Sequence, residues 1–558
     1  MSQEKSLAQY QQSYFLGIGG IGMSAIARYF LSLQLPVYGY DKTPSPLTEN
    51  LANEGASISF SDAVIDLPEA VCKGIHNTLF ILTPAIPKDH PQWVWLLEHG
   101  AFIQKRSEVL GFIAKNSFCI AVAGTHGKTT TSTLIAHLLH GCNINFTAFL
   151  GGISSNFNSN YIRKINGIAL FQEDANKEIV VLEADEFDRS FHRLSPDLAI
   201  ITAIDPDHLD IYENTAAFTE AFVHFASLIR SVVDTYYADS TSAPVGKIAT
   251  GAFSGKDPSK VDRSAGNENQ AKRDPYFAEG DEPSVSKTSS KNRTGNPGDG
   301  NPEFDLRRDK PHGAGLVIQE SIHITTQKSI AKCTYGLGVN AVFRARDVRV
   351  EQGDYCFDFI YAGQFLGRFR CGLPGHHNVQ NTLAALGICH GFLGLPIKEL
   401  QEGIASFKGA KRRFETVVKT AKHIVIDDYA HHPEEIKAIV HSVRTLYPNK
   451  HITGLFQPHL FSRTKDFARE FADSLSALDT VWLMDIYPAR ENPIPGITST
   501  WLLEMIQNPR KHLLSADQIH TEIYNSPPEL LLILGAGDID RLIEPVRKQY
   551  EEISTSHQ

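Results

Sequence analysis

The chain has 558 residues, which is too long for a single hydrophobic core and indicates three or four domains. A hydrophobic content of 42% and a charged content of 21% are typical of a soluble globular protein. The formal net charge of −10 argues against a general nucleic-acid-binding role, because it implies no basic surface.

The cysteines and the apolar runs indicate the compartment. The chain has 7 cysteines, widely spaced, and none of them forms a Cys-x-x-Cys pair. This pattern fits a reducing compartment without disulfides or structural zinc. Residues 1–12 are polar and carry no apolar signal segment, and no run of about 18 apolar residues occurs. We therefore expect a cytoplasmic protein without membrane insertion.

The first apolar stretch, at 14–16, leads into a cluster of glycines at 17–22, Gly-Ile-Gly-Gly-Ile-Gly. A helix is expected over 23–33 and a second strand over 37–40, followed at once by Asp41. Apolar runs then recur between helix-like stretches, at 78–82 and 101–103. This alternation predicts a parallel α/β sheet, and we place a Rossmann-like domain at residues 1–116.

The glycine cluster fits the pattern G-x-G-x-x-G, and Asp41 stands where an acid would bind a ribose hydroxyl. On its own this pattern indicates an NAD-dependent dehydrogenase. The physical requirement is only a diphosphate at a helix N-terminus, so any nucleotide diphosphate would suit it. Thr83 and Arg106 could supply further contacts to an anion, although a solvated surface charge is the simpler interpretation of Arg106 alone.

A second glycine-rich turn at 124–131, Gly-Thr-His-Gly-Lys-Thr-Thr-Thr, lies between an apolar run and a helix-like stretch. Strand, glycine turn, lysine, hydroxyl residue and helix predict a loop whose backbone N–H groups cradle a nucleotide triphosphate. Lys128 would reach the β- and γ-phosphates, and the Thr129 hydroxyl would hold Mg²⁺. Val122 stands where the strict pattern has its first glycine, so this is a shorter variant of the loop.

Carboxylates and a histidine follow the next two apolar runs. Glu183 ends the first run and opens an acidic segment that reaches residue 188, and His208 follows the second run. Ligand groups in open α/β sheets collect at the carboxyl ends of strands, so Glu183 is a predicted Mg²⁺ ligand. We expect some of the other acids to be solvated. For His208, a structural role and a role at a metal or phosphate both stay open.

The second domain, placed at 117–407, contains a compositional anomaly. Residues from about 241 to 313 are dominated by Ser, Gly, Asn, Asp, Lys and Pro and show neither a helical nor a strand period. Such a segment cannot bury enough apolar surface to order itself, so we predict a flexible surface insertion.

The third domain, placed at 408–558, alternates strands and helices again. Its apolar runs lie at 424–426, 452–456, 481–484 and 531–534. They predict a second Rossmann-like sheet.

Together these motifs resemble the Mur ligases, the ATP-dependent amide-forming enzymes of peptidoglycan synthesis. Further matching stretches are Pro374–Asn381, Lys411–Glu415, Asp427–Pro433, Gln457–His459, Ser462–Thr464, Tyr487–Glu491 and Gly535–Ile539. The resemblance covers nearly the whole chain except roughly 235–315. The insertion has no counterpart in the usual family pattern.

The resemblance implies an α/β fold of three domains: a Rossmann-like N-terminal domain for a UDP-sugar, a central phosphate-loop ATPase domain with a parallel sheet, and a Rossmann-like C-terminal domain for the incoming amino acid. The implied ATP-binding residues are Gly124, Thr125, His126, Gly127, Lys128, Thr129 and Thr130, with Asn378 and Asn381 facing the adenine. The implied UDP-sugar residues are Gly19, Gly20, Ile21, Gly22, Asp41, Thr83 and Arg106. The implied amino-acid and phosphate site is Arg413, Asp428, His431 and Arg463. The implied catalytic residues are Lys128, Glu183 and His208, and the implied Mg²⁺ ligands are Thr129, Glu183 and His208.

The implied reaction joins the lactyl carboxylate of UDP-N-acetylmuramate to L-alanine through an acyl phosphate, with ATP and Mg²⁺. Which group takes the proton from the alanine ammonium stays open between His431 and His208. A family member that attaches a whole recycled peptide to the same UDP-sugar is the nearest alternative, and a dehydrogenase and a non-catalytic nucleotide switch are the others. We expect no nucleic-acid partner and a monomer or weak homodimer.

Overall fold

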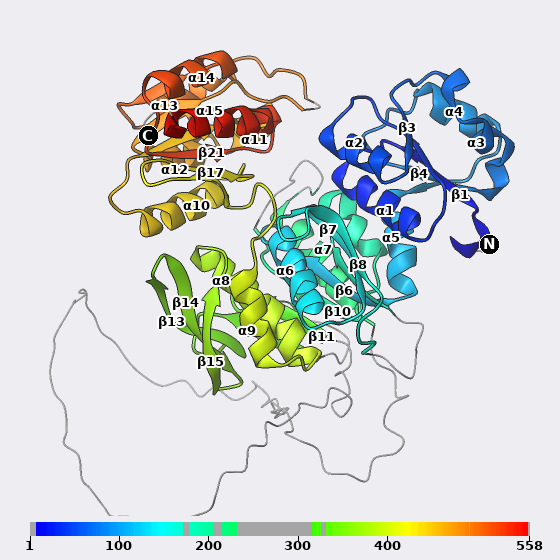
Figure 1. The fold of residues 1–558 in the computed structure, drawn as a ribbon, viewed down its shortest axis with the longest axis horizontal. Helices are drawn as coiled ribbons and strands as arrows, with labels where there is room; N and C mark the ends of the chain where they lie inside the picture. The colour runs from blue at the N-terminus through cyan, green and yellow to red at the C-terminus, as the bar shows by residue number, and fades with distance from the viewer. Residues whose placement is uncertain are drawn as a thin grey trace, which may run out of the picture. The chain divides into compact units, whose positions relative to one another are not determined.

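The computed structural model describes residues 7–170, 178–205, 212, 214–230, 315–322, 324, 331–489 and 491–555. The predicted insertion at 241–313 and His208 lie outside these residues. The described chain forms three sheets that alternate with helices along the sequence (Figure 1). This α/β fold agrees with the sequence prediction.

The first sheet is parallel throughout and has β1 at its centre, in the order β3-β2-β1-β4-β5. Its strands are β1 (Gln12–Leu16), β2 (Val37–Tyr40), β3 (Ser57–Ser59), β4 (Thr78–Leu82) and β5 (Ile103–Lys105). Its helices are α1 (Ile21–Ser32), α2 (Pro46–Asn53), α3 (Glu69–Lys73), α4 (Pro91–Glu98) and α5 (Arg106–Lys115). Strand β5 begins at Ile103, whereas the apolar run placed it at residue 101.

The second sheet is mixed, in the order β15-β14-β13-β12-β11-β10-β6-β9-β7-β8. Its strands are β6 (Phe118–Ala123), β7 (Phe146–Ser154), β8 (Ser159–Lys164), β9 (Ile179–Glu183), β10 (Leu198–Ile201), β11 (Gly315–Gln319), β12 (Ala331–Gly336), β13 (Phe343–Glu351), β14 (Asp354–Tyr361) and β15 (Gln364–Cys371). From β13 to β7 all neighbours run parallel, as predicted. Strands β14 and β15 at one edge and β8 at the other are antiparallel.

Two tight turns explain the antiparallel edge. Gln352 and Gly353 join β13 to β14, and Ala362 and Gly363 join β14 to β15. All four residues have positive φ, between 48° and 90°. Two consecutive residues of this kind are typical of the hairpin turn whose twist matches the flanking strands. The chain therefore folds back at once, and no crossover helix is needed.

The helices of the second sheet lie on both of its faces. They are α6 (Lys128–Gly141), α7 (Thr215–Ser227), α8 (His376–Leu386) and α9 (Ile397–Ser406). One buried cluster contains Ile120 and Val122 of β6 with apolar residues of α6, α8 and α9. The alternate residues Cys119 and Ala121 belong to a second cluster, which continues into α1 and the first sheet. Helix α1 also contacts β7 and β8, so the N-terminal and central sheets share one apolar core.

The third sheet has the order β16-β17-β21-β18-β19-β20 and is parallel except for β16. Its strands are β16 (Glu415–Lys419), β17 (Ile424–Asp428), β18 (Ile452–Phe456), β19 (Thr480–Leu483), β20 (Lys511–Leu513) and β21 (Leu530–Leu534). Its helices are α10 (Pro433–Leu446), α11 (Phe461–Asp466), α12 (Ala468–Ser476), α13 (Ser499–Met505), α14 (Ala516–Asn525) and α15 (Ile543–Thr555). Two separate apolar clusters cover its two faces.

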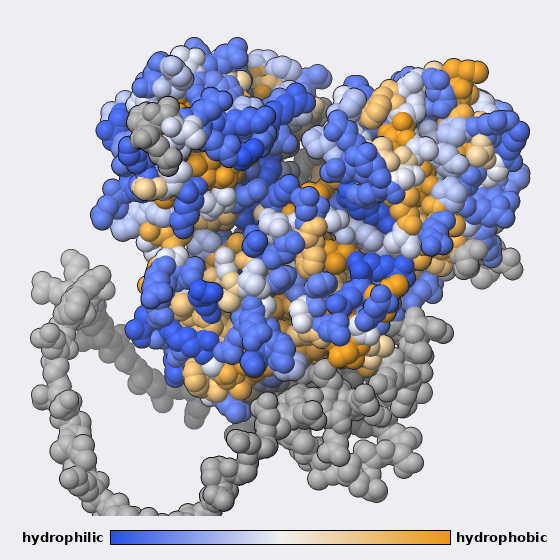
Figure 2. Space-filling view, in the orientation of Figure 1, coloured by the Kyte–Doolittle hydropathy of each residue, from blue (hydrophilic) through white to orange (hydrophobic). Residues whose placement is uncertain are grey.

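The visible surface is mainly hydrophilic, with smaller hydrophobic areas between the polar ones (Figure 2). The most exposed large apolar side chains of the described residues include Ile65, Val339 and Tyr524, which lie far apart in the sequence. Within the described part of the chain, no helix has the length and apolarity needed to cross a membrane.

Candidate active site

The turn between β6 and α6 has the backbone of a phosphate-binding loop. Gly124 and Gly127 have φ values of +130° and +81°, which L side chains rarely adopt. A Cβ at Gly124 would stand 2.1 Å from Thr202 Oγ1, and one at Gly127 would stand 2.4 Å from Asn381 Oδ1. Gly127 is the N-cap of α6, and no side chain caps this helix end. Its N–H groups therefore remain available for an anion.

Lys128 folds back over this loop. Its Nζ donates to the carbonyl oxygens of Gly124 at 2.6 Å and Thr125 at 3.4 Å, and it contacts Glu186 Oε2 at 2.8 Å. Burial lowers the pKa of Lys128, but the nearby carboxylates of Glu186 and Glu183 raise it by more. The pKa of Lys128 is therefore above its usual value. The side chain is thus a fixed positive charge at the centre of the loop.

Thr129 and Glu183 lie together at the start of α6 and the end of β9. The Thr129 hydroxyl donates to Glu183 Oε2 at 2.9 Å, and the N–H of Gly151 donates to the same oxygen at 3.1 Å. Burial raises the pKa of Glu183 above its usual value. A hydroxyl and a carboxylate beside a phosphate loop are oxygen ligands of the kind that Mg²⁺ takes.

The described residues do not complete a metal site by themselves. No group of three or more His, Cys, Asp or Glu side chains with metal-binding geometry occurs among them. Thr129 and Glu183 fit one side of a Mg²⁺ ion, since such an ion usually takes one or two carboxylates and completes its shell with phosphate oxygens and water. The third predicted ligand, His208, lies outside the described residues.

Asn378 and Asn381 stand on the first turns of α8, against the phosphate loop. Asn381 donates to Asn378 Oδ1 at 3.2 Å, and Asn378 donates to the carbonyl of Pro374 at 2.6 Å. Because Asn381 Oδ1 lies beside Gly127, this side chain is placed against the phosphate loop itself. Their predicted contact with adenine stays a prediction.

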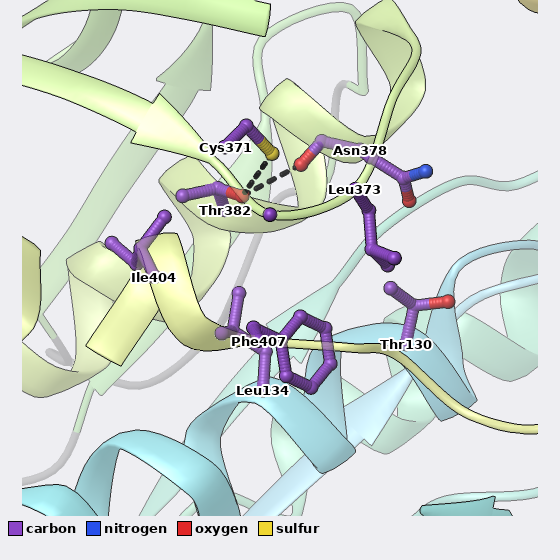
Figure 3. Close-up of a pocket in the computed structure, with 9 residues that line it drawn as sticks. Thr130, Leu134, Cys371, Leu373, Asn378, Thr382, Ile404 and Phe407 are labelled. Atoms are coloured by element: carbon purple, nitrogen blue, oxygen red, sulfur yellow. Dashed lines mark hydrogen bonds between the residues drawn. The ribbon is translucent and has the colours of Figure 1, made fainter. Parts of the chain in front are cut away.

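A crevice opens beside these residues, and Figure 3 shows how it is lined. Thr130 and Leu134 of α6 face Asn378 and Thr382 of α8 across it, and the ring of Phe407 lies beside Leu134. The side chains leave no room for a water molecule inside. Thr130 thus lines the contact of α6 with α8, and its predicted contact with ATP stays a prediction.

The first glycine-rich turn, at 17–22, has different neighbouring side chains from the phosphate loop. Gly17 has φ +87°, and a Cβ there would stand 2.4 Å from Thr83 Cγ2. The N–H of Gly19 donates to Asp41 Oδ2 at 2.7 Å. Gly20 is the N-cap of α1, again without a side-chain cap. This turn offers backbone N–H groups and one carboxylate.

Arg106 lies close to the same turn. A Cβ at Gly22 would stand 2.9 Å from Arg106 Nη1, so the guanidinium packs against the first turn of α1. Its Nη2 donates to Asp185 Oδ2 at 3.3 Å, which links the N-terminal domain to the acidic segment after β9. The structure thus brings Gly22 and Arg106 together, and it places Ile21 as the first residue of α1.

The predicted amino-acid and phosphate site gathers around the end of β17. Asp428 accepts from the N–H groups of Phe414 at 2.6 Å and Ala430 at 2.8 Å, so it holds two loop segments together. Burial raises the pKa of Asp428 to about 6. The guanidinium of Arg413 lies 5.0 Å from the centre of the Tyr429 ring.

His431 follows on the same loop. Its Nδ1 contacts the carbonyl of Tyr429 at 2.9 Å, and burial lowers the pKa of His431 to about 4. The charge of Arg463 acts in the same direction, which places Arg463 near this imidazole. Arg463 itself is 9% exposed on α11. His431 is therefore a neutral imidazole at neutral pH.

Two carboxylates of this region were missed by sequence reasoning. Glu186 is 2% exposed and pairs with Lys128, although its acidic segment indicated solvated side chains. The position of this segment directly after a strand and opposite a lysine loop was a usable signal. Glu435 accepts from His126 Nδ1 of the phosphate loop, at 3.0 Å and over a separation of 309 residues. No local pattern predicts a contact over that distance.

Three family models match consecutive parts of the chain. They are the Mur ligase family catalytic domain at 12–118, the Mur ligase middle domain at 122–292 and the Mur ligase glutamate ligase domain at 412–537. This chain belongs to the Mur ligase family. The glycine turn of the phosphate loop, the end of β9 and the Asp428 loop thus lie in matched parts of a Mur ligase.

Curated relatives of this Mur ligase align over nearly its whole length. A UDP-N-acetylmuramate–L-alanine ligase of Porphyromonas gingivalis is 42% identical over 541 residues, which cover 96% of this chain and 98% of the relative. A relative of the same name from Flavobacterium johnsoniae is 38% identical over 547 residues, which cover 98% of this chain and 99% of the relative.

Solved structures share the fold of this Mur ligase. A UDP-N-acetylmuramate–alanine ligase of Thermotoga maritima has a TM-score of 0.68 at 22% identity and covers 97% of this chain and 99% of its own. A murein peptide ligase of Psychrobacter arcticus has a TM-score of 0.57 at 18% identity and covers 98% of both chains. At such identities the likeness concerns the fold, including its three-domain architecture.

Proposed function

We propose that this chain is an ATP-dependent ligase that forms an amide between the lactyl carboxylate of UDP-N-acetylmuramate and L-alanine, in peptidoglycan synthesis. The observation that carries the proposal is the 42% identity over 96% of the chain to a relative named for this reaction. The phosphate loop with Lys128, Thr129 and Glu183 supports it, because amide formation needs an activated carboxylate. We further propose the boundaries 1–116, 117–407 and 408–558 for the three domains.

The chemistry follows from the weakness of a carboxylate as an electrophile. A carboxylate oxygen attacks the γ-phosphorus of ATP, the bond from that phosphorus to the β,γ-bridging oxygen breaks, and ADP leaves. The acyl phosphate is then attacked at carbon by the neutral amine of L-alanine. Inorganic phosphate leaves with the former carboxylate oxygen, the amine loses a proton, and the amide remains.

The proposed roles of the phosphate-loop residues are electrostatic. Lys128 would leave the Gly124 carbonyl and neutralise charge on the transferred phosphoryl group. Thr129 and Glu183 would hold Mg²⁺, which supplies further neutralisation of the phosphate oxygens when bound. The N–H groups at the uncapped start of α6 would bind the phosphates without any change of conformation.

The proposed roles in the C-terminal domain concern the amine. Arg413 and Arg463 would hold the carboxylate of L-alanine and the phosphate, since a guanidinium suits planar anions. His431 is one candidate to accept the proton of the alanine ammonium, although its lowered pKa of about 4 makes the imidazole a weak base. His208 remains the other candidate for this proton.

The nearest alternative is a ligase that attaches a peptide to the same UDP-sugar. The fold is shared with a murein peptide ligase and does not separate the two. The names of the 42% and 38% identical relatives favour L-alanine. A dehydrogenase is the weaker alternative, because it gives no role to Lys128 and Glu183.

Release of inorganic phosphate tests the proposal. The purified protein is given ATP, Mg²⁺ and UDP-N-acetylmuramate, with L-alanine, with the tripeptide L-alanyl-γ-D-glutamyl-diaminopimelate, or without an acceptor. We expect phosphate release with L-alanine and little without it. Release with the tripeptide alone would identify the recycling ligase, and release that ignores both acceptors would contradict a ligase function.

A further inference from the structure

Glu435 is a largely buried carboxylate that contacts two loops, one after β17 and one after β6. It is the third residue of α10, in the C-terminal domain, and its side chain is 15% exposed. Its Oε2 accepts from the N–H groups of His431 at 3.0 Å and His432 at 3.3 Å. Its Oε1 contacts Nδ1 of His126 at 3.0 Å. One carboxylate thus contacts both the loop after β17 and the phosphate loop after β6.

His126 is held from both sides. It lies between the two positive-φ glycines of the phosphate loop, and Thr202 of the central sheet donates to its carbonyl. Its Nε2 lies 3.6 Å from Asp205 Oδ2, and its Nδ1 faces Glu435. The imidazole therefore bridges a carboxylate of the central domain and a carboxylate of the C-terminal domain.

The C-terminal partners of Glu435 belong to the predicted amino-acid and phosphate site. Arg413 Nη1 lies 4.0 Å from Oε1, and His431 supplies one of the N–H groups that Oε2 accepts. Burial raises the pKa of Glu435, but the hydrogen bond and charge of His126 and the charge of Arg413 lower it by more, so the pKa of Glu435 lies well below its usual range. Glu435 is therefore ionised, and its charge is shared between two loops.

We propose that Glu435 is a positioning residue that fixes the phosphate loop against the amino-acid loop, so that nucleotide binding and amino-acid binding are coupled. The inference rests on the proposed ligase function. An acyl phosphate made at one loop has to meet an amine held by the other, and misplacement by about 1 Å can reduce such a rate about 100-fold. A single carboxylate bonded to both loops sets that distance directly.

The alternative is that Glu435 only caps α10. A glutamate at the third helical position commonly accepts N–H groups before the helix, and its contacts with His431 and His432 fit that role. A cap alone would change the amount of folded protein or the amino-acid loop. It would not change the apparent affinity for ATP, because no atom of the phosphate loop takes part in a cap.

The test is a double-mutant cycle on the full chain with Glu435→Gln and His126→Asn. Gln keeps an oxygen for the helix cap and removes the charge that faces His126 and Arg413. We expect Glu435→Gln to raise the KM for ATP and the KM for L-alanine roughly tenfold each, since a hydrogen bond to a charged group is lost. We expect the two changes to be non-additive by about threefold or more in kcat/KM.

Glu434→Gln is the matched control, because Glu434 is the neighbouring residue and its exposed carboxylate accepts a hydrogen bond from Lys437. It should leave both KM values unchanged. His126→Asn gives a second readout if Glu435→Gln is poorly folded, since it leaves the cap of α10 intact. It should raise the KM for L-alanine although His126 lies on the phosphate loop.

An unchanged KM for ATP in Glu435→Gln would overturn the inference, and so would additive effects of the two changes. If Glu435→Gln does not fold, an unchanged KM for L-alanine in His126→Asn would overturn it equally. The proposed function fails in a different way, through absence of L-alanine-dependent phosphate release in the unaltered protein.

Discussion

The two glycine-rich turns have similar backbone arrangements but carry different side chains. Each follows a strand with a parallel neighbour on both sides, each opens a helix, and neither α1 nor α6 has a side-chain cap. In the first turn the N–H of Gly19 is bonded to the carboxylate of Asp41. In the second turn the charge at the centre is the ammonium of Lys128.

The comparison shows that the backbone of a glycine-rich turn is suited to bind phosphate, whereas the side chains of the turn decide which reaction it can support. A helix N-terminus with free N–H groups suits any diphosphate. A lysine, a hydroxyl and a carboxylate are needed in addition for transfer of a phosphoryl group. The sequence of the first turn fits the dinucleotide-binding pattern G-x-G-x-x-G. This turn has no lysine for phosphoryl transfer, so we interpret it as a binding site for the substrate.

The largest expected effect is that of Lys128→Ala. Removing the charge at the phosphate loop should reduce kcat by about 1,000-fold or more, because the developing charge on the phosphoryl group loses its main partner. Binding of UDP-N-acetylmuramate should stay within about twofold of the unaltered protein. Phosphate release and calorimetric titration measure the two quantities, and comparable turnover in the variant would remove Lys128 from the mechanism.

The next largest effects are expected from alanine substitutions at one glycine of each turn, which should each weaken the binding of a different ligand. Gly127→Ala meets a positive φ and Asn381 Oδ1 at 2.4 Å, and Gly17→Ala meets a positive φ and Thr83 at 2.4 Å. We expect Gly127→Ala to weaken ATP binding by roughly 10- to 100-fold and Gly17→Ala to weaken UDP-sugar binding by a similar factor. Each should spare the other ligand.

Gly141→Ala is the control for these changes, because it ends α6 and a Cβ there meets nothing within 4 Å. It should bind both ligands as the unaltered protein does. Loss of both ligands in Gly127→Ala or Gly17→Ala would mean that the two turns are not independent sites.

A smaller effect is expected from Asp41→Asn. The change keeps the shape and removes the charge that accepts from Gly19 at 2.7 Å. We expect the Kd of UDP-N-acetylmuramate to rise roughly tenfold, as for loss of one charged hydrogen bond, with ATP binding unchanged. Titration of each ligand separately checks this. A change in the Kd of ATP would contradict the assignment of Asp41 to the UDP-sugar site.

The last expected effect is on stability and not on ligand binding, and it concerns His431 on the loop after β17. Its pKa is about 4, below the value of about 6.5 for an unfolded histidine. Between these values the unfolded chain binds more protons, so stability falls as the pH drops from 6.5 to 4. The decrease in Tm over this range should be smaller in His431→Asn. An equal decrease in both proteins, or a His431 ring that NMR shows protonated at pH 5.5, would contradict this assignment.

Many of the strands were predictable from the sequence, because local hydrophobic patterns are enough to locate them. Buried parallel strands are short continuous apolar runs, and β1, β6, β9 and β17 lie where those runs occur. The hairpins around Gly353 and Gly363 were missed, since their turns are Gln-Gly and Ala-Gly and lack the commonest hairpin residues.

The site was predictable where one loop or one strand end carries it. Lys128, Thr129 and Glu183 meet because β6 and β9 are neighbours and their carboxyl ends share an edge. Glu435 could not be predicted, because its partner His126 belongs to another sheet and only the assembled fold brings them together. Local sequence specifies an element, and contacts between sheets depend on packing.

The central claim is that the phosphate loop activates the lactyl carboxylate of the UDP-sugar whose diphosphate the first turn binds. Its most direct test is the transfer of oxygen from UDP-N-acetylmuramate labelled with ¹⁸O in the lactyl carboxylate, in a reaction with ATP, Mg²⁺ and L-alanine. An acyl phosphate passes one carboxylate oxygen to the phosphate that leaves, so mass spectrometry should find one ¹⁸O in the released phosphate for each doubly labelled carboxylate consumed. Unlabelled phosphate would mean that water, and not the carboxylate, attacked ATP, and would contradict the account.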